Sequence, residues 1–180
     1  MNYSPLQPLK KFQSLFLFVL SFFIVSYGQP AGISWLSAIS ALCGYAIICR
    51  VLLDIPSAKQ RFIVGSVWFI AIQGVQLFWM LYHPYNYIYF VYSGFSILWG
   101  IQWGLLAVLI TPERLNKISQ VFALASIWTL LEWSRLFFLS GYTWNPSGIA
   151  LAENAYSMQL ASVGGIFLLT FWVILVNLMG

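Results

Sequence analysis

Residues 128–144 read WTLLEWSRLFFLSGYTW, a stretch that starts inside an apolar run and still carries an acidic and a basic side chain three positions apart. The helical repeat places Glu132 one turn after Trp128 and Arg135 nearly one turn after Glu132, so the three side chains share one side of a helix. An unpaired charge at the centre of a bilayer costs ~2.5–3.5 kcal/mol on insertion scales. If this run spans a membrane, each charged group should face protein or a wet cavity, and Arg135 can also extend to the nearby border.

The composition is that of an integral membrane protein. Of the 180 residues, 61% are hydrophobic, 19% aromatic and 7% charged, whereas soluble domains carry roughly 25% charged residues. The 8 basic and 4 acidic side chains are too few to cover a core of this size with a polar surface. The longest basic run is Lys10 and Lys11, which is not the clustered pattern of nucleic-acid-binding proteins. The sequence therefore predicts a membrane protein with no nucleic-acid partner.

Apolar runs that alternate with short polar segments predict an all-α bundle of about six membrane-spanning helices, because a helix needs ~20 residues to cross hydrocarbon. The predicted spans cover residues 12–27, 33–53, 62–82, 88–110, 119–139 and 157–179. The first span has a basic start, an apolar middle and a small-residue end, so it also fits a cleaved signal peptide. Between the fourth and fifth spans, Thr111 followed by Pro112 and Glu113 predicts the start of a short helix.

The basic residues predict the orientation of the chain in the membrane, because Lys and Arg collect in short cytoplasmic loops. With a cytoplasmic N-terminus, 7 of the 8 basic residues fall on the cytoplasmic side: Lys10, Lys11, Arg50, Lys59, Arg61, Arg114 and Lys117. Arg135 then lies at the outer face, and both ends of the chain are cytoplasmic. The outer border is expected to carry an aromatic belt of Tyr82, Tyr85, Tyr87, Tyr89, Tyr142, Trp144 and Tyr156.

Glycines in the fourth predicted span indicate close helix packing. In GFSILWGIQWG (94–104), Gly100 and Gly104 lie four residues apart, a step that lets neighbouring helices approach each other. We interpret this spacing as packing between neighbouring spans, since the sequence has no repeat that would indicate an inverted transporter fold.

The cysteines and the histidine are not arranged as a metal site or a catalytic site. Cys43 and Cys49 lie six positions apart in one predicted helix, which points them to different sides and too far apart for a disulfide. His83 stands in a loop without another ligand-type residue nearby in the sequence. The glycine pair in SVGGIF (162–167) is not followed by the Lys-Ser or Lys-Thr of a phosphate loop. We therefore expect no metal, no cofactor and no catalytic residue in this chain.

Two interpretations of Glu132 and Arg135 stay open at this stage. In the structural one, the two side chains form a local ion pair that also holds the following Gly-containing loop, and the neighbouring tryptophans only pack. In the functional one, they belong to a wall beneath the outer surface, where a lipid headgroup or carbonyl meets Arg135.

Four stretches together resemble the N-terminal membrane part of the apolipoprotein N-acyltransferase family. They are GISWLSAISALCGYAIICR (32–50), KQRFIVGSVWFIAIQGVQLFWMLY (59–82), WTLLEWSRLFFLSGYTWNPSGIAL (128–151) and LASVGGIFLLTFWVILVNLM (160–179). The third is the most specific, because it is similar to the family's W-x-x-x-E-W-x-R segment followed by a Gly-aromatic-x-Trp turn. Departures from the family pattern are Ser140, Thr143 and the NPSG sequence at 145–148.

The resemblance implies an enzyme of the bacterial inner membrane that takes an acyl chain from a phospholipid. The acceptor is the N-terminal diacylglyceryl-cysteine of a lipoprotein. Family members carry the catalytic Glu, Lys and Cys on a nitrilase-like domain, and no position here matches those three, so we expect this chain alone to be inactive. For this chain the resemblance implies a lipid entry at the outer end of the fifth span. Glu132 and Arg135 would fix that end of the helix, and Trp128, Trp133 and Trp144 would line or brace the entry. The alternative is a small multispan membrane protein that binds or transports a lipid or solute.

Overall fold

The computed structural model describes residues 7–28, 33–138, 141–142, 144–153 and 155–180. The helices are α1 (Lys11–Tyr27), α2 (Ser34–Ile39), α3 (Tyr45–Leu53), α4 (Ala58–Gln76), α5 (Ile88–Val108), α6 (Pro112–Leu115), α7 (Ile118–Ser134) and α8 (Ala155–Met179). A π-helical turn, η1 (Ser40–Gly44), joins α2 to α3, and 3-10 turns form η2 (Phe78–Tyr82), η3 (Arg135–Phe137) and η4 (Ser147–Leu151). These ranges contain no strand, so the predicted all-α bundle is confirmed.

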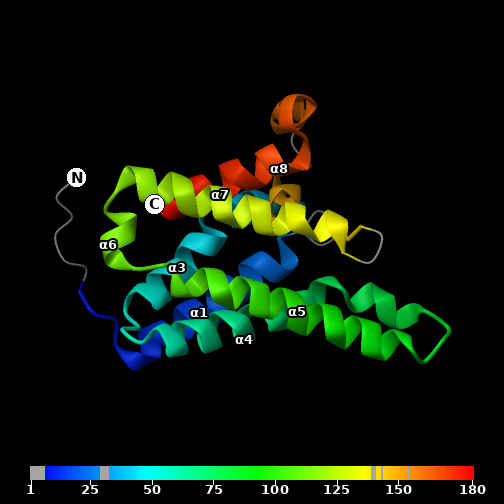
Figure 1. Ribbon diagram of the computed structural model, residues 1–180, viewed down its shortest axis with the longest axis horizontal. Helices are drawn as coiled ribbons and strands as arrows, with labels where there is room; N and C mark the ends of the chain where they lie inside the picture. The colour runs from blue at the N-terminus through cyan, green and yellow to red at the C-terminus, as the bar shows by residue number, and fades with distance from the viewer. Residues whose placement is uncertain (1–6, 29–32, 139–140, 143, 154) are drawn as a thin grey trace.

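The continuous helix made of α2, η1 and α3 lies at the centre of the bundle (Figure 1). It contacts α1 on one side and α8 on the other. Helix α4 packs along most of α5, and α7 packs on α8. Rings from four of these helices meet in the core, where Tyr45 contacts Trp68 and Trp128, and Trp103 contacts both tryptophans. The centre of the fold is therefore an aromatic cluster between α3, α4, α5 and α7.

Among the residues that the structure describes, three helical segments are long and apolar enough to cross a membrane: Trp35–Leu53, Ile88–Val108 and Ala155–Met179. The predicted count of six spans is therefore not confirmed. Helices α1 and α7 have 17 residues each, and the 19-residue α4 begins with polar residues at 59–61. The first predicted span, α1, packs against α2, α3 and α4 as part of the bundle.

Helices α4 and α7 end six and five residues before the predicted limits of 82 and 139, and both continue as 3-10 turns. In each helix a side chain takes up a carbonyl of the last α-helical turns. The Tyr92 hydroxyl donates to the Gly74 carbonyl at 2.6 Å, and Gln102 Nε2 donates to the Leu131 carbonyl at 2.9 Å. Because the side chain already satisfies this carbonyl, the carbonyl does not need a backbone N–H from a further α-helical turn.

The π-helical turn, which the sequence analysis did not predict, is held by polar side chains from two other helices. Asn177 Oδ1 accepts the backbone N–H groups of Tyr45 and Ala46 at 2.9 and 2.8 Å, while its Nδ2 donates to the Ala41 carbonyl at 2.7 Å. Ser21 Oγ donates to the Gly44 carbonyl at 2.7 Å. Backbone groups inside a membrane must find partners within the protein. Asn177 and Ser21 supply those partners where the helix changes its hydrogen-bond pattern.

The close approach predicted for Gly100 and Gly104 is confirmed. A Cβ atom at Gly104 would meet Ser66 Oγ and would lie 2.9 Å from the Phe62 carbonyl, and one at Gly100 would lie 3.0 Å from the Ser66 carbonyl. Gly94 on the same helix has no such neighbour within 4 Å. The two later glycines therefore set the spacing between α4 and α5.

Basic residues gather at one end of the bundle, as the pattern of Lys and Arg predicted. Arg50 pairs with Asp54 at 2.7 Å and also donates to the Gln7 carbonyl at 2.6 Å, which ties the segment before α1 to the end of α3. Arg61 donates to the Ile55 carbonyl at 2.7 Å and to the end of α5 at the Val108 carbonyl, 3.3 Å away. Figure 1 places α6 and the C-terminus at this end, too.

The short helix predicted after Thr111 is α6, with Pro112 in its first turn. A backbone N–H hydrogen bond and then the Thr111 side chain lower the pKa of Glu113. Glu113 therefore carries its negative charge at the positive end of α6.

The aromatic belt at the outer border stays a prediction, but most of its members lie on the surface. Tyr82, Tyr85, Tyr87, Tyr89, Trp144 and Tyr156 are exposed, and the first four follow the η2 end of the bundle. Tyr142 does not belong to the belt, because it is only 3% exposed and packs against Phe95 and Trp99 at ring distances of 4.6 and 4.9 Å. The hydrogen bond from its backbone N–H to the Arg135 carbonyl folds the chain back onto the bundle and carries Tyr142 inside.

Replacing Gly104 with alanine should destabilise the protein, because the new methyl group meets Ser66 and the Phe62 carbonyl. Overpacking of this kind costs about 1–3 kcal/mol. The free energy of unfolding, measured by denaturant titration in detergent micelles, checks the effect. Gly94→Ala is the matched control, since its methyl group has open space and should stabilise the helix by up to about 1 kcal/mol. Equal effects of the two substitutions would contradict the packing role of Gly104.

Asn177→Leu should destabilise the protein because it leaves the Tyr45 N–H, the Ala46 N–H and the Ala41 carbonyl without their partner. Each buried group that loses its partner costs about 1–3 kcal/mol. The same unfolding titration measures the loss, and Asn116→Leu at an exposed loop position is the control. A stability change no larger than that of the control would show that Asn177 does not hold the π-helical turn.

Candidate functional site

Glu132 is buried at the end of α7 opposite to the basic cluster, and it joins three separate segments. Its Oε1 accepts the Ser147 hydroxyl at 2.7 Å, the Ser147 backbone N–H at 2.9 Å and Trp128 Nε1 at 3.2 Å. Its Oε2 accepts the Thr170 hydroxyl at 2.8 Å. Hydrogen bonds to an acidic group are roughly twice as strong as those between neutral groups. Glu132 thereby fixes η4 and α8 to the end of α7, and we call this arrangement the Glu132 lock.

Gly148 lets η4 approach α8 closely enough for the Glu132 lock to form. A Cβ atom at this position would collide with the backbone of α8, including the Ile166 carbonyl at 2.6 Å. The Gly148 N–H in turn donates to the Thr170 hydroxyl at 3.0 Å. The NPSG sequence at 145–148 therefore contributes both the hydroxyl that binds Glu132 and the glycine that contacts α8.

Arg135 is 4% exposed and lies against a different set of residues. Its Nε donates to Gln102 Oε1 at 2.9 Å, and its guanidinium carbon lies 4.7 Å from the ring centroid of Trp99. Contacts of a cation with an aromatic face are worth ~2 kcal/mol when water is excluded. The ion pair between Glu132 and Arg135 in the structural interpretation is not formed, because each side chain binds groups from other helices. The second part of that interpretation, that the two residues hold the following loop, agrees with the bonds of Glu132 to Ser147 and of the Arg135 carbonyl to the Tyr142 N–H.

The Arg135 guanidinium has a hydrogen-bond donor that is not used within the described chain. Its Nη1 is buried and has no hydrogen-bond partner among the residues that the structure describes. Together with Gln102, Glu132, Trp128 and Trp103 it lines a narrow cleft between α5 and α7 of about 10 Å³, close to the volume needed for one water molecule. Burial raises the pKa of the neighbouring Tyr142 to about 12, so that phenol is neutral beside the guanidinium.

The tryptophans expected to contact lipid lie in two different environments. Trp128 is 3% exposed and belongs to the aromatic core, where its ring meets Tyr45 at 4.9 Å. Trp133 is 45% exposed and packs edge-on against Phe137. Trp144 is 44% exposed and meets the ring of Trp79 at 5.0 Å. Trp133 and Trp144 are therefore on the surface, whereas Trp128 supports Glu132 from within.

Sequence reasoning missed Ser147, Thr170, Gln102 and Trp99, all of which contact Glu132 or Arg135. Thr170 and Gln102 could have been predicted to face the protein interior, because each is a polar residue inside an apolar helix. Ser147 carried no comparable signal because hydroxyl residues are common in loops.

The described residues contain no group of three or more His, Cys, Asp and Glu side chains placed to hold a metal ion. Cys43 and Cys49 are free thiols, and Cys49 is buried. His83 is exposed and contacts the rings of Tyr85 and Tyr87.

Comparison with known proteins matches almost the entire chain. The family described as apolipoprotein N-acyltransferase N-terminal domain matches residues 16–179. An apolipoprotein N-acyltransferase of Chlamydia pneumoniae is 28% identical over 172 residues, which is 91% of this chain and 32% of that protein. That of Chlamydia muridarum is 29% identical over 174 residues, covering 93% and 32%, and that of Rhodopirellula baltica is 25% identical over 121 residues, covering 62% and 20%.

No solved structure matches the chain. The chain spans about a third of the length of the two Chlamydia relatives. The family match extends from the middle of α1 to the end of α8, and it includes Glu132, Arg135, Ser147 and Thr170. This chain belongs to the apolipoprotein N-acyltransferase N-terminal domain family.

Proposed function

We propose that this chain is the membrane module of an apolipoprotein N-acyltransferase. The full enzyme would transfer an acyl chain from a phospholipid to the N-terminal diacylglyceryl-cysteine of a lipoprotein, and the module would guide lipid toward the site of transfer. The family match supports this function over that of a small lipid- or solute-transporting protein. The nitrilase-like domain would supply the catalytic groups.

The Glu132 lock is the observation that carries the proposal. It fastens Ser147 at 2.7 Å to the end of α7, and Ser147 lies three residues after Trp144. The exposed Trp144 is thereby held at the same end of the bundle as Arg135. A rigid arrangement of an aromatic surface and a cation beneath a membrane border suits the recognition of a lipid, whose chain is apolar and whose ester and phosphate oxygens accept hydrogen bonds.

The residues at this end of the bundle would have different roles in lipid binding. Trp133 and Trp144, each close to half exposed, would offer apolar ring surface to acyl chains. Arg135 Nη1, buried and without a partner in the described chain, would reach a lipid oxygen through a water molecule in the cleft beside it. Glu132 and Trp128 would position the loop without touching lipid themselves.

We further propose that the module lies in the bacterial inner membrane with both ends of this chain in the cytoplasm. Basic residues at the α1, α3 and α6 end of the bundle support this orientation, because Lys and Arg favour the cytoplasmic side. The Glu132 lock would then face the outer side, where the lipoprotein acceptor is found.

Trp144→Ala should weaken the use of the phospholipid donor, because the lipid loses an aromatic contact while the lock stays intact. In the full enzyme we expect KM for the phospholipid to rise about tenfold, which corresponds to 1.4 kcal/mol of lost contact, with kcat little changed. Transfer of a labelled acyl chain to a diacylated lipopeptide in detergent micelles measures both constants. Trp172→Ala is the control, since Trp172 is 45% exposed but lies far along α8. The lipid-access role of Trp144 is wrong if both variants change KM equally.

Glu132→Gln should release the loop at 141–151 from α7 and α8. Glutamine keeps the shape but replaces one acceptor oxygen with an N–H₂ donor, which opposes the Ser147 or Thr170 donors. Lost hydrogen bonds to a charged group cost about 1.5–3 kcal/mol each. Limited proteolysis should cut the loop faster, and unfolding should need less denaturant. Glu153→Gln, at an exposed position after the loop, is the control; cleavage no faster than in the control would contradict the lock.

A further inference from the structure

The narrow cleft between α5 and α7 combines two buried hydrogen-bond donors that have no partner in the described part of the chain. Arg135 Nη1 is one, and Trp103 Nε1 is the other. The two residues are 4% and 3% exposed, and both line the cleft. A buried donor without a partner destabilises a protein. Two such donors from the walls of one small cleft therefore indicate a ligand that accepts hydrogen bonds.

The size of the cleft and a third polar group in its wall fit a water molecule. The volume is about 10 Å³, and one buried water needs ~10–15 Å³ and about three polar partners. Gln102 lines the same cleft, and its Oε1 accepts Arg135 Nε at 2.9 Å. Because a carboxamide oxygen has two lone pairs, it can accept one more hydrogen bond. The cleft therefore offers two donors and one acceptor to a water molecule.

The walls of the cleft favour water over an anion. A guanidinium and an indole N–H could also hold chloride, but the Glu132 carboxylate lines the same cleft. A negative charge at this distance repels an anion. A water molecule can also donate to the remaining lone pair of Gln102 Oε1, whereas chloride has no proton to donate.

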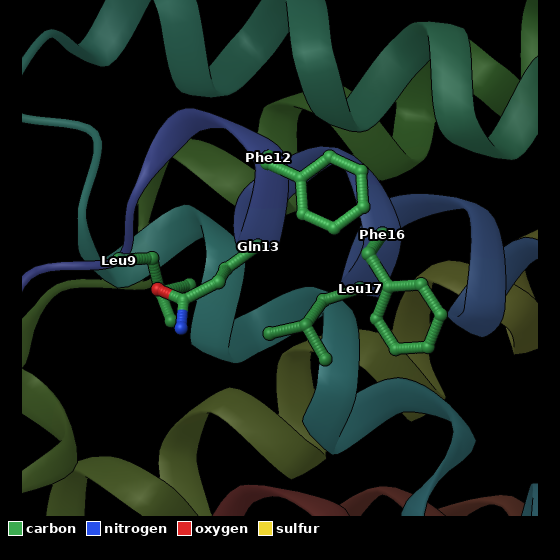
Figure 2. A pocket seen from close by; sticks show the side chains of 5 residues that line it. All are labelled: Leu9, Phe12, Gln13, Phe16 and Leu17. Carbon is green, nitrogen blue, oxygen red and sulfur yellow. The ribbon is translucent and has the colours of Figure 1, made fainter.

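A larger hollow on the surface of α1 has a different kind of wall (Figure 2). Its volume is about 260 Å³, and it is lined by Leu9, Phe12, Gln13, Phe16 and Leu17. The polar side chain in this lining is Gln13, whose Oε1 already accepts the Lys10 N–H at 2.9 Å. None of these five described side chains has a buried polar atom without a partner. The α1 hollow therefore has no group that would hold a water molecule in place as the cleft does.

We propose that the cleft between α5 and α7 binds one ordered water molecule, which accepts the Arg135 Nη1 and Trp103 Nε1 donors and donates to Gln102 Oε1. This water gives both buried donors a partner and joins α5 to the end of α7. The site depends only on the walls of the cleft, whereas the use of this water to reach a lipid oxygen rests on the proposed function.

Magnetisation transfer from water to the tryptophan indoles tests the site. The chain is labelled with nitrogen-15 tryptophan, deuterated elsewhere and studied by NMR in deuterated micelles, with Trp103→Phe and Trp68→Phe to assign two indole signals. We expect a cross-peak between Trp103 Nε1–H and water with the sign of a bound water molecule. Trp68 is the matched control and should give no cross-peak. Its Nε1 is also buried without a partner among the described residues, but Trp68 does not line the cleft.

Three substitutions identify the source of the signal. Gln102→Met removes the acceptor, so the Trp103 cross-peak should weaken about fivefold, the factor expected for one lost hydrogen bond. Gln120→Met, at an exposed position of α7, should leave it unchanged. Ser66 Oγ lies beside Gly104, and its exchanging proton could imitate bound water. Ser66→Ala should therefore also leave the cross-peak unchanged. Circular dichroism checks that the variants fold as wild type does.

Each outcome supports or overturns the water site. A cross-peak on Trp103 and not on Trp68, weakened by Gln102→Met alone, supports it. The site is overturned by the absence of this cross-peak in folded wild-type protein, by equal cross-peaks on both tryptophans, or by a signal that is lost in Ser66→Ala or kept in full in Gln102→Met. A shift of the Trp103 signal when gluconate replaces chloride would identify an anion instead.

The same variant separates the water site from the proposed function. If Gln102→Met loses the cross-peak but leaves KM for the phospholipid unchanged in the full enzyme, the water site is supported and its role in reaching lipid is wrong. If KM rises while wild-type protein gives no cross-peak, the reverse holds.

Discussion

Hydrogen bonds between buried polar groups of distant segments join the helices of this bundle. A buried polar side chain without a partner costs free energy in an apolar environment, so each such hydrogen bond stabilises the contact that contains it. Asn177 binds the backbone of the π-helical turn, and Thr170 binds Glu132. These two residues are seven positions apart, so they lie on one face of α8. One face of α8 therefore contacts the central helix through Asn177 and contacts α7 and η4 through Thr170.

The contacts of Asn177 and Thr170 lie in the second half of α8, which is buried, whereas the first half is largely exposed. Gly165 has φ +65°, which breaks the helical path five residues before Thr170. The turns before Gly165 are largely exposed and stand away from the rest of α8 in Figure 1. The buried residues of α8 all lie between Leu169 and Leu178. η4 therefore contacts both parts of α8: Thr170, after the kink, bonds Gly148 and Glu132, and Ser157, before the kink, donates to the Leu151 carbonyl at 2.6 Å.

Local patterns could be predicted from the sequence, and contacts between distant segments could not. The four-residue step of Gly100 and Gly104 indicated close packing, since helical spacing alone places both on one side. Glu132 and Arg135 stood out because charges are rare in apolar runs. Their partners Ser147, Thr170 and Gln102 lie 15, 38 and 33 residues away from them, and no periodicity connects them. The π-helical turn is likewise a tertiary feature, held by Asn177 from more than 130 residues away.

The separation of Glu132 from Arg135 bears on what each residue can do. Glu132 is saturated, because its two oxygens accept from Trp128, Ser147 and Thr170. If Arg135 were its partner, both groups would be neutralised and neither would attract a ligand. Instead Arg135 rests on the face of Trp99 and one neutral amide, and its Nη1 keeps a donor without a partner in the described chain. Of this pair, Arg135 and not Glu132 is therefore the residue that keeps a hydrogen-bond donor unused by the residues that the structure describes.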